Sequence, residues 1–191
     1  MKKLFASLSL ILILLSLLLS CGKDGKEADG SVTYYGSVVY IEELNNTCVF
    51  IPGIGEVELP RLEDKSAPTI KRGDLVRIRF DSGNDLSIME SYPARFGAFA
   101  AEIEVKNIGL AIERVGDEYR LYGDIPKEIG NLSLGEELLI AKKNGESEKE
   151  ILRGQIVSFT DKTFSLTLDR DTELSLLLKE LFSSSITIKT E

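Results

Sequence analysis

Apolar and polar residues alternate in several stretches of this chain. Val76, Ile78 and Phe80 recur at every second position, and Arg77 and Arg79 lie between them. Successive side chains of a β-strand point to opposite faces, so this alternation is typical of a half-buried antiparallel strand. The pattern predicts a mainly β protein.

A long β-branched and aromatic segment, Val32–Ile41, is the first of these stretches. Gly36 lies at its middle, where a glycine often marks a bulge or a bend that lets one strand serve two sheets. Shorter segments of the same kind follow at 47–51, 56–59, 74–80 and 101–106. Five strands within residues 32–106 predict a small closed barrel.

Residues 107–191 are expected to form a second domain. Gly116-Asp117 separates two further alternating segments, 110–115 and 118–122, which is a hairpin signal. The charged stretch 144–150 is expected to be a solvated loop.

Two stretches of this second domain have the same pattern as stretches of the first. The segment that begins at Gly135 parallels the one that begins at Gly73, and residues 154–168 parallel residues 36–51. The spacing between the parallel segments differs, so a true repeat is not expected. The parallels predict a second, diverged domain that is β-barrel-like.

One helix is predicted at about 172–182. Its leucines recur at helical spacing, and Asp171 or Thr172 is the expected N-cap, with Lys179 near the C-terminal end. A leucine stripe of this length is typical of a lid on a barrel core, and a partner-binding helix is the alternative. The stripe consists of Leu174, Leu177, Leu178 and Leu181.

The start of the chain has the organisation of a secretory signal. Lys2 and Lys3 precede an apolar run that ends at the small residue Ser20, and no basic stop-transfer cluster follows. As a helix the run would span about 24 Å, short of a hydrocarbon core of about 30 Å. We expect residues 1–20 to be a cleaved signal peptide.

The residues Leu18-Leu19-Ser20-Cys21-Gly22 resemble a bacterial lipobox. The resemblance implies cleavage just before Cys21 and a diacylglycerol on its thiol, where two or more acyl chains give stable membrane attachment. It also implies a membrane-anchored lipoprotein of the cell envelope that faces outside the cytoplasm. The alternative is an ordinary secretory signal that ends beside a cysteine. Residues 21–31 read as the lipidated cysteine and a flexible tether that reaches at most about 35 Å.

Composition excludes several kinds of chemistry. The net charge is −8 and no basic cluster is present, which argues against binding to nucleic acid. Histidine is absent, so Ser-His and Cys-His nucleophile pairs and histidine-ligated zinc are excluded. We expect no cofactor and no metal. With Cys21 lipidated, Cys48 has no disulfide partner and is expected to be a buried thiol.

A second resemblance covers residues 32–106. Val38-Val39-Tyr40, the Lys71–Ile78 segment, Met89–Ala94 with its Glu-Ser-Tyr-Pro-Ala motif, and Ile103-Glu104-Val105 are similar to a family of small, largely uncharacterised bacterial secreted and lipoprotein domains. The resemblance implies an OB-type five-stranded barrel and an envelope location. It implies no activity, because the family has none established.

Glu90, Tyr92 and Pro93 are the candidate site residues of this barrel. In one interpretation they form a barrel corner, where Pro93 fixes the backbone and the Tyr92 hydroxyl satisfies a backbone group. In the other they form a ligand-facing patch, where Tyr92 stacks and Glu90 accepts hydrogen bonds.

Two classes of function are consistent with the sequence. The favoured class is a lipid-anchored binding or assembly module without catalytic activity, whose partner is another envelope protein or a small ligand. The alternative is an envelope hydrolase that depends on carboxylates. Its candidate residues are Glu90, Glu102, Asp169 and Asp171.

Overall fold

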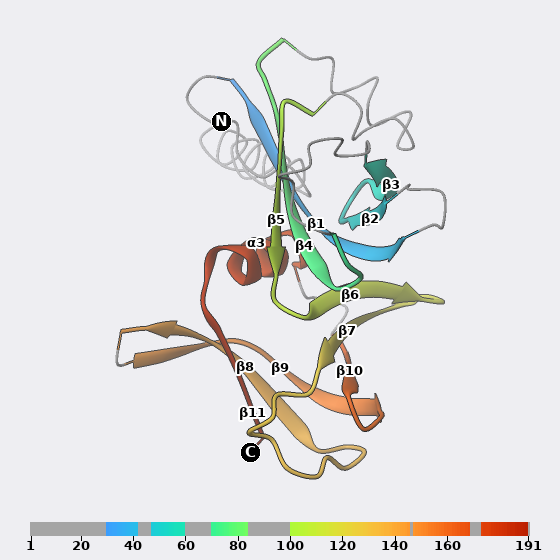
Figure 1. The fold of residues 1–191 in the computed structure, drawn as a ribbon, viewed down its shortest axis with the longest axis vertical. Helices are drawn as coiled ribbons and strands as arrows, with labels where there is room; N and C mark the ends of the chain where they lie inside the picture. The colour runs from blue at the N-terminus through green and yellow to red at the C-terminus, as the bar shows by residue number, and fades with distance from the viewer. Residues whose placement is uncertain are drawn as a thin grey trace, which may run out of the picture.

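A computed structural model of the chain describes residues 30–41, 47–59, 70–83, 100–145, 147–168 and 173–190. Within them, strands form two antiparallel sheets, and one helix lies between the sheets (Figure 1). The prediction of a mainly β protein is therefore confirmed.

The first sheet has five strands in the order β3-β2-β1-β4-β5. Its outer strands, β3 and β5, each pair with one neighbour only, so this sheet is open in the part of the chain that the structure describes. The closed barrel predicted for residues 32–106 is not observed there. The strands are β1 (Val32–Ile41), β2 (Thr47–Ile51), β3 (Gly55–Leu59), β4 (Asp74–Phe80) and β5 (Glu102–Asn107).

Strand β1 bends because it changes partners along its length. Its first half pairs with β4 from Val32 to Ser37, and its second half pairs with β2 from Ser37 onward. Gly36 lies next to this change, and its backbone approaches β2 so closely that an added Cβ would be 2.5 Å from Val49 Cγ1. A glycine at this position is what such a close approach requires, as the sequence predicts.

The second sheet has six strands in the order β11-β8-β9-β10-β7-β6. The hairpin predicted around Gly116-Asp117 is confirmed by β6 and β7. Residues 144–150 are not a simple loop, because β8 and β9 extend into this charged stretch and pair there. The strands are β6 (Leu110–Val115), β7 (Glu118–Asp124), β8 (Glu137–Asn144), β9 (Ser147–Phe159), β10 (Thr163–Thr167) and β11 (Ile186–Thr190). This sheet is likewise open within the described residues.

The two sheets share one arrangement of five strands. Strands β7-β10-β9-β8-β11 of the second sheet occupy the places of β3-β2-β1-β4-β5 in the first, and every pairing is antiparallel. Gly154 in β9 is opposite Leu138, as Gly36 in β1 is opposite Val76. Both central strands carry a one-residue bulge on the side of the next hairpin strand.

The turns before β4 and β8 are also equivalent. Gly73 and Gly135 have positive φ angles of 89° and 80°, a region that favours glycine. The next residue, Asp74 or Glu136, accepts a hydrogen bond on its carboxylate from a backbone N–H three residues earlier, at 2.7 and 2.8 Å. Burial raises the pKa of Asp74, and the N–H of Lys71 opposes this shift. The parallels seen in the sequence thus correspond to shared backbone structure, although the strands follow a different order along the chain.

Helix α3 (Leu174–Ser183) packs against both sheets. Its buried residues are Leu177, Leu178 and Leu181, three of the four predicted leucines. The residue at the N-cap is Glu173, which makes no side-chain capping hydrogen bond, so neither Asp171 nor Thr172 has the predicted role. The helix begins two residues later than predicted.

One hydrophobic core joins the two sheets. Phe50 and Leu75 of the first sheet belong to the same buried cluster as the α3 leucines and the inner residues of the second sheet. A separate buried cluster, which includes Val38, Val76 and Phe80, is formed by residues of the first sheet alone. The chain passes from one sheet to the other between Asn107 and Leu110. The division into domains at 106/107 stays a prediction, and the shared core makes us expect both sheets to unfold together.

Candidate functional site

The sequence-predicted site residues lie outside the described part of the chain. This applies to Cys21 and to the group Glu90, Tyr92 and Pro93. The choice between a barrel corner and a ligand-facing patch therefore stays open.

Of the four carboxylates proposed for a hydrolase, the structure describes Glu102 alone. Its carboxylate accepts a hydrogen bond of 2.9 Å from Arg79 Nε across the β4–β5 pair. Arg79 also binds Asp81, and Arg77 binds Glu104 on the same face. Glu102 is thus one member of an ordinary ladder of cross-strand ion pairs.

The electrostatics of Glu102 are those of a stably ionised group. The hydrogen bond from Arg79 lowers the pKa of Glu102, and desolvation opposes this shift in part. A general acid near neutral pH needs the opposite shift, because its carboxyl group must stay protonated. This geometry gives no support to Glu102 as a catalytic acid.

We expect a titration followed by NMR to place the pKa of Glu102 below that of an ordinary glutamate. Arg79→Gln should raise it, whereas Arg77→Gln should have a smaller effect, because Arg77 acts on Glu102 only through space. The lowered folded-state pKa means that this ion pair stabilises the fold at neutral pH and that the contribution is lost as the pH falls through that pKa. An unchanged pKa in Arg79→Gln would contradict the assignment.

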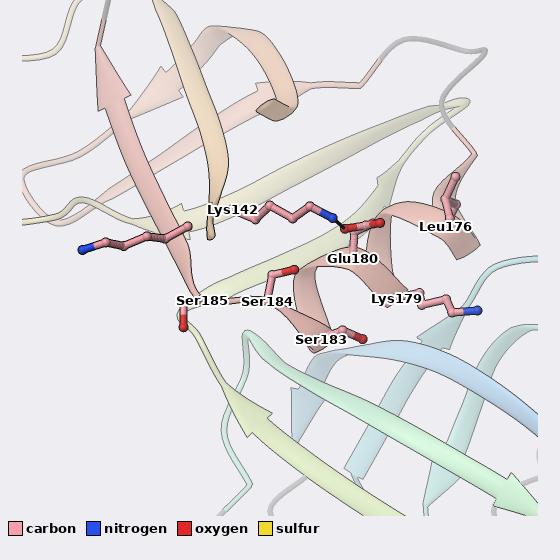
Figure 2. Close-up of a pocket in the computed structure, with 8 residues that line it drawn as sticks. Lys142, Leu176, Lys179, Glu180, Ser183, Ser184 and Ser185 are labelled. Carbon is pink, nitrogen blue, oxygen red and sulfur yellow. Dashed lines mark hydrogen bonds and ion pairs between the residues drawn. The ribbon is translucent and has the colours of Figure 1, made fainter. Parts of the chain in front are cut away.

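A hollow in the described residues lies beside α3. It has a volume of about 550 Å³ and lies between the helix and the end of β8. Figure 2 shows Lys142 extending from its strand to Glu180 on the helix, while Lys179 points away from this pair. Lys142 Nζ donates to Glu180 Oε2 at 2.5 Å. The hollow is lined by Lys142, Lys143, Leu176, Lys179, Glu180 and Ser183–Ser185.

A second hollow of about 450 Å³ is also lined by this ion pair. Lys142, Glu180 and Leu176 line both hollows. Leu176 is 49% exposed, whereas Leu177, Leu178 and Leu181 of the same helix are buried. We call the two hollows together the α3 groove.

The groups of the α3 groove are suited to binding. Ammonium groups and hydroxyls line it, together with three apolar side chains and three carboxylates. The apolar side chains are Ile151, Leu176 and Leu177, and the carboxylates are Glu150, Glu173 and Glu180. Within the described residues, no three metal-ligating side chains come together as a metal site would require. The arrangement can hold a ligand by hydrogen bonds and charge. Two of its carboxylates already pair with basic side chains, Glu180 with Lys142 and Glu150 with Arg153.

The C-terminal end of α3 is fixed by a lysine from the first sheet. Lys106 Nζ, on β5, donates to the carbonyl oxygens of Leu181, Phe182 and Ser184 at 3.2, 2.6 and 2.5 Å. The last turn of the helix contains no basic residue of its own. Burial lowers the pKa of Lys106, since its charge is partly removed from water. This contact sets the position of Ser183–Ser185 in the groove.

Sequence reasoning missed the residues that build this region. The sequence places Lys106 only within a predicted strand, 101–106, and gives Lys142 and Glu180 no role. A lysine 75 residues from the helix end it binds gives no local signal. The pairing of Lys142 with Glu180 depends in the same way on a contact between distant segments.

Comparisons with known proteins found no relative of this chain. No protein-family model, no curated protein and no solved structure matches it. Among the helices of the described residues, none has the length and apolar character needed to cross a bilayer.

Proposed function

We propose that this chain is a lipid-anchored module of the cell envelope that binds or assembles with a partner and has no catalytic activity. The observation that carries the proposal is the Leu18–Gly22 run, which resembles a lipobox and is followed by a short polar stretch. The folded structure begins soon afterwards with β1 at Val32. A lipid on Cys21 would hold this β-rich body at a membrane surface.

The strand order of the first sheet supports an OB-type fold. In such a barrel the long first strand pairs with both the second and the fourth strand, and β1 pairs here with both β2 and β4. The order β3-β2-β1-β4-β5 is that of an OB-type barrel opened between its third and fifth strands. We propose this fold for residues 32–106, and the shared arrangement extends the proposal to a related sheet in 107–191.

Binding is favoured over hydrolysis by the α3 groove. Its ammonium and hydroxyl groups and the exposed Leu176 offer contacts to a protein segment or a small ligand. The acidic net charge of −8 disfavours nucleic acid as the partner. We therefore propose another envelope protein or a small ligand as the partner, with the membrane contacted through the lipid.

Lipidation is tested by metabolic labelling with a palmitate analogue. We expect Cys21→Ala to abolish the label and to leave the precursor uncut, because the thiol that carries the lipid is gone. Cys48→Ala is the matched control and should keep the label, since Cys48 is a buried thiol on β2. Equal labelling of the wild type and Cys21→Ala would refute the proposed anchor.

A further inference from the structure

We propose that the first sheet stands next to the bilayer and holds the second sheet and the α3 groove at the outer end of the molecule. The inference rests on the proposed lipid anchor at Cys21. It concerns which part of the body a partner in the aqueous envelope space meets first.

The tether joins the folded body at one end of the first sheet. Gly30, the first described residue, lies against Ser82 at the end of β4, and an added Cβ would be 3.3 Å from Ser82 Cβ. Val32 pairs with Phe80 at this same end of the sheet. The tether therefore reaches the first sheet at the end that contains Val32, Phe80 and Ser82.

The first sheet contacts the second sheet at the opposite end of the β1–β4 pair. Ser37 Oγ of β1 accepts a buried hydrogen bond of 2.9 Å from Ile112 N of β6. Five residues of strand separate Val32 from Ser37, a distance of about 17 Å. The second sheet is thus displaced along β1 from the Val32 end of the first sheet, and the two sheets lie at opposite ends of the view in Figure 1.

The contact region between the two sheets, the joint, contains several specific interactions. Besides Ser37 and Lys106, two aromatic pairs cross it, Tyr35 with Phe182 and Phe50 with Tyr119, at centroid distances of 5.6 Å each. Arg72 binds Glu113 at 2.6 Å at its edge. These contacts, spread over β1, β2, β5, β6, β7 and α3, oppose bending between the sheets, so the second sheet stays on the far side of the first sheet from the tether end.

Strand β11 runs from the joint toward the far end of the second sheet. Ser184, whose carbonyl binds Lys106, marks the level of the joint, and β11 begins two residues later. It then runs away from the first sheet to Thr190, near the C-terminus (Figure 1). Ser82, Ser183 and Thr190 therefore mark the tether end, the joint and the outer end, and all three are exposed.

The order of these positions above the membrane is tested by energy transfer. Single cysteines at Ser82, Ser183 and Thr190 carry a donor dye, and the lipidated protein is reconstituted into vesicles whose headgroups carry an acceptor. We expect transfer to fall in the order Ser82→Cys, Ser183→Cys, Thr190→Cys. Cys48 is buried and should not take the dye, which the parent protein checks. Circular dichroism checks that each variant folds.

The possible outcomes separate this inference from the proposed anchor. Equal transfer at the three positions, or the reverse order, overturns the orientation while the anchor stands. No transfer at any position overturns the anchor itself, and the orientation with it. The Cys21→Ala protein without its leader gives the baseline for an unattached body, and transfer equal to that baseline counts as none.

Discussion

Leu178→Ala is expected to lower the free energy of unfolding by about 2–5 kcal/mol. Leu178 is fully buried on α3, within the core that combines residues of both sheets. Removing its side chain leaves a cavity at the joint of the molecule, where strands from two sheets limit how far the structure can relax. Chemical denaturation monitored by circular dichroism measures the loss, and we expect a single transition because the core is shared.

The matched control for this prediction is Leu176→Ala on the same helix. Leu176 is 49% exposed, so its truncation should change stability by no more than about 0.5 kcal/mol. Both variants replace leucine with alanine in one helix, so helix propensity cancels in the comparison. Equal effects of the two substitutions would show that α3 does not pack as described.

Gly36→Ala is expected to destabilise the protein by about 1–3 kcal/mol through overpacking. The new Cβ would be 2.5 Å from Val49 Cγ1 and 3.0 Å from the carbonyl oxygen of Phe50. The oxygen belongs to the backbone of β2 and cannot rotate away, so the two strands must separate. Thermal or chemical unfolding measures the cost, and amide exchange should show weaker protection along β1 and β2.

Gly130→Ala is the control for this substitution. No heavy atom lies within 4 Å of the Cβ that it would add, and the glycine does not require a positive φ. Its stability should match or slightly exceed that of the wild type, because alanine restricts the unfolded chain. A neutral Gly36→Ala would mean that β1 does not approach β2 as closely as described.

The sequence predicted the local structure well where one strand or hairpin carries the signal. The alternation of Val76, Ile78 and Phe80 with two arginines identified β4, and Gly36 identified the bend of β1. The similarity between the segments at Gly73 and Gly135 identified equivalent turns. These features follow from side-chain periodicity and from the φ angles that glycine permits, which are properties of neighbouring residues.

The candidate site was less predictable. The α3 groove depends on Lys142 and Lys106, whose partners are 38 and 75 or more residues away. Asp171 or Thr172 as the N-cap of α3, and Lys179 near its C-terminal end, were predicted from local rules. In the structure Glu173 is at the N-cap, and Lys106 of the first sheet donates to the C-terminal carbonyls.

The sequence by itself determined that this is a mainly β protein with two related sets of strands and one leucine-rich helix. Only the tertiary structure decided that the two sheets share a core. Leu75 and Tyr35 of the first sheet contribute to it, whereas their counterparts in the second sheet, Glu137 and Arg153, are exposed. Alternation predicts that a strand has two faces, but it does not tell which distant surface will cover the outer one. That choice depends on which apolar areas can be buried together, and it is made only when the whole chain packs.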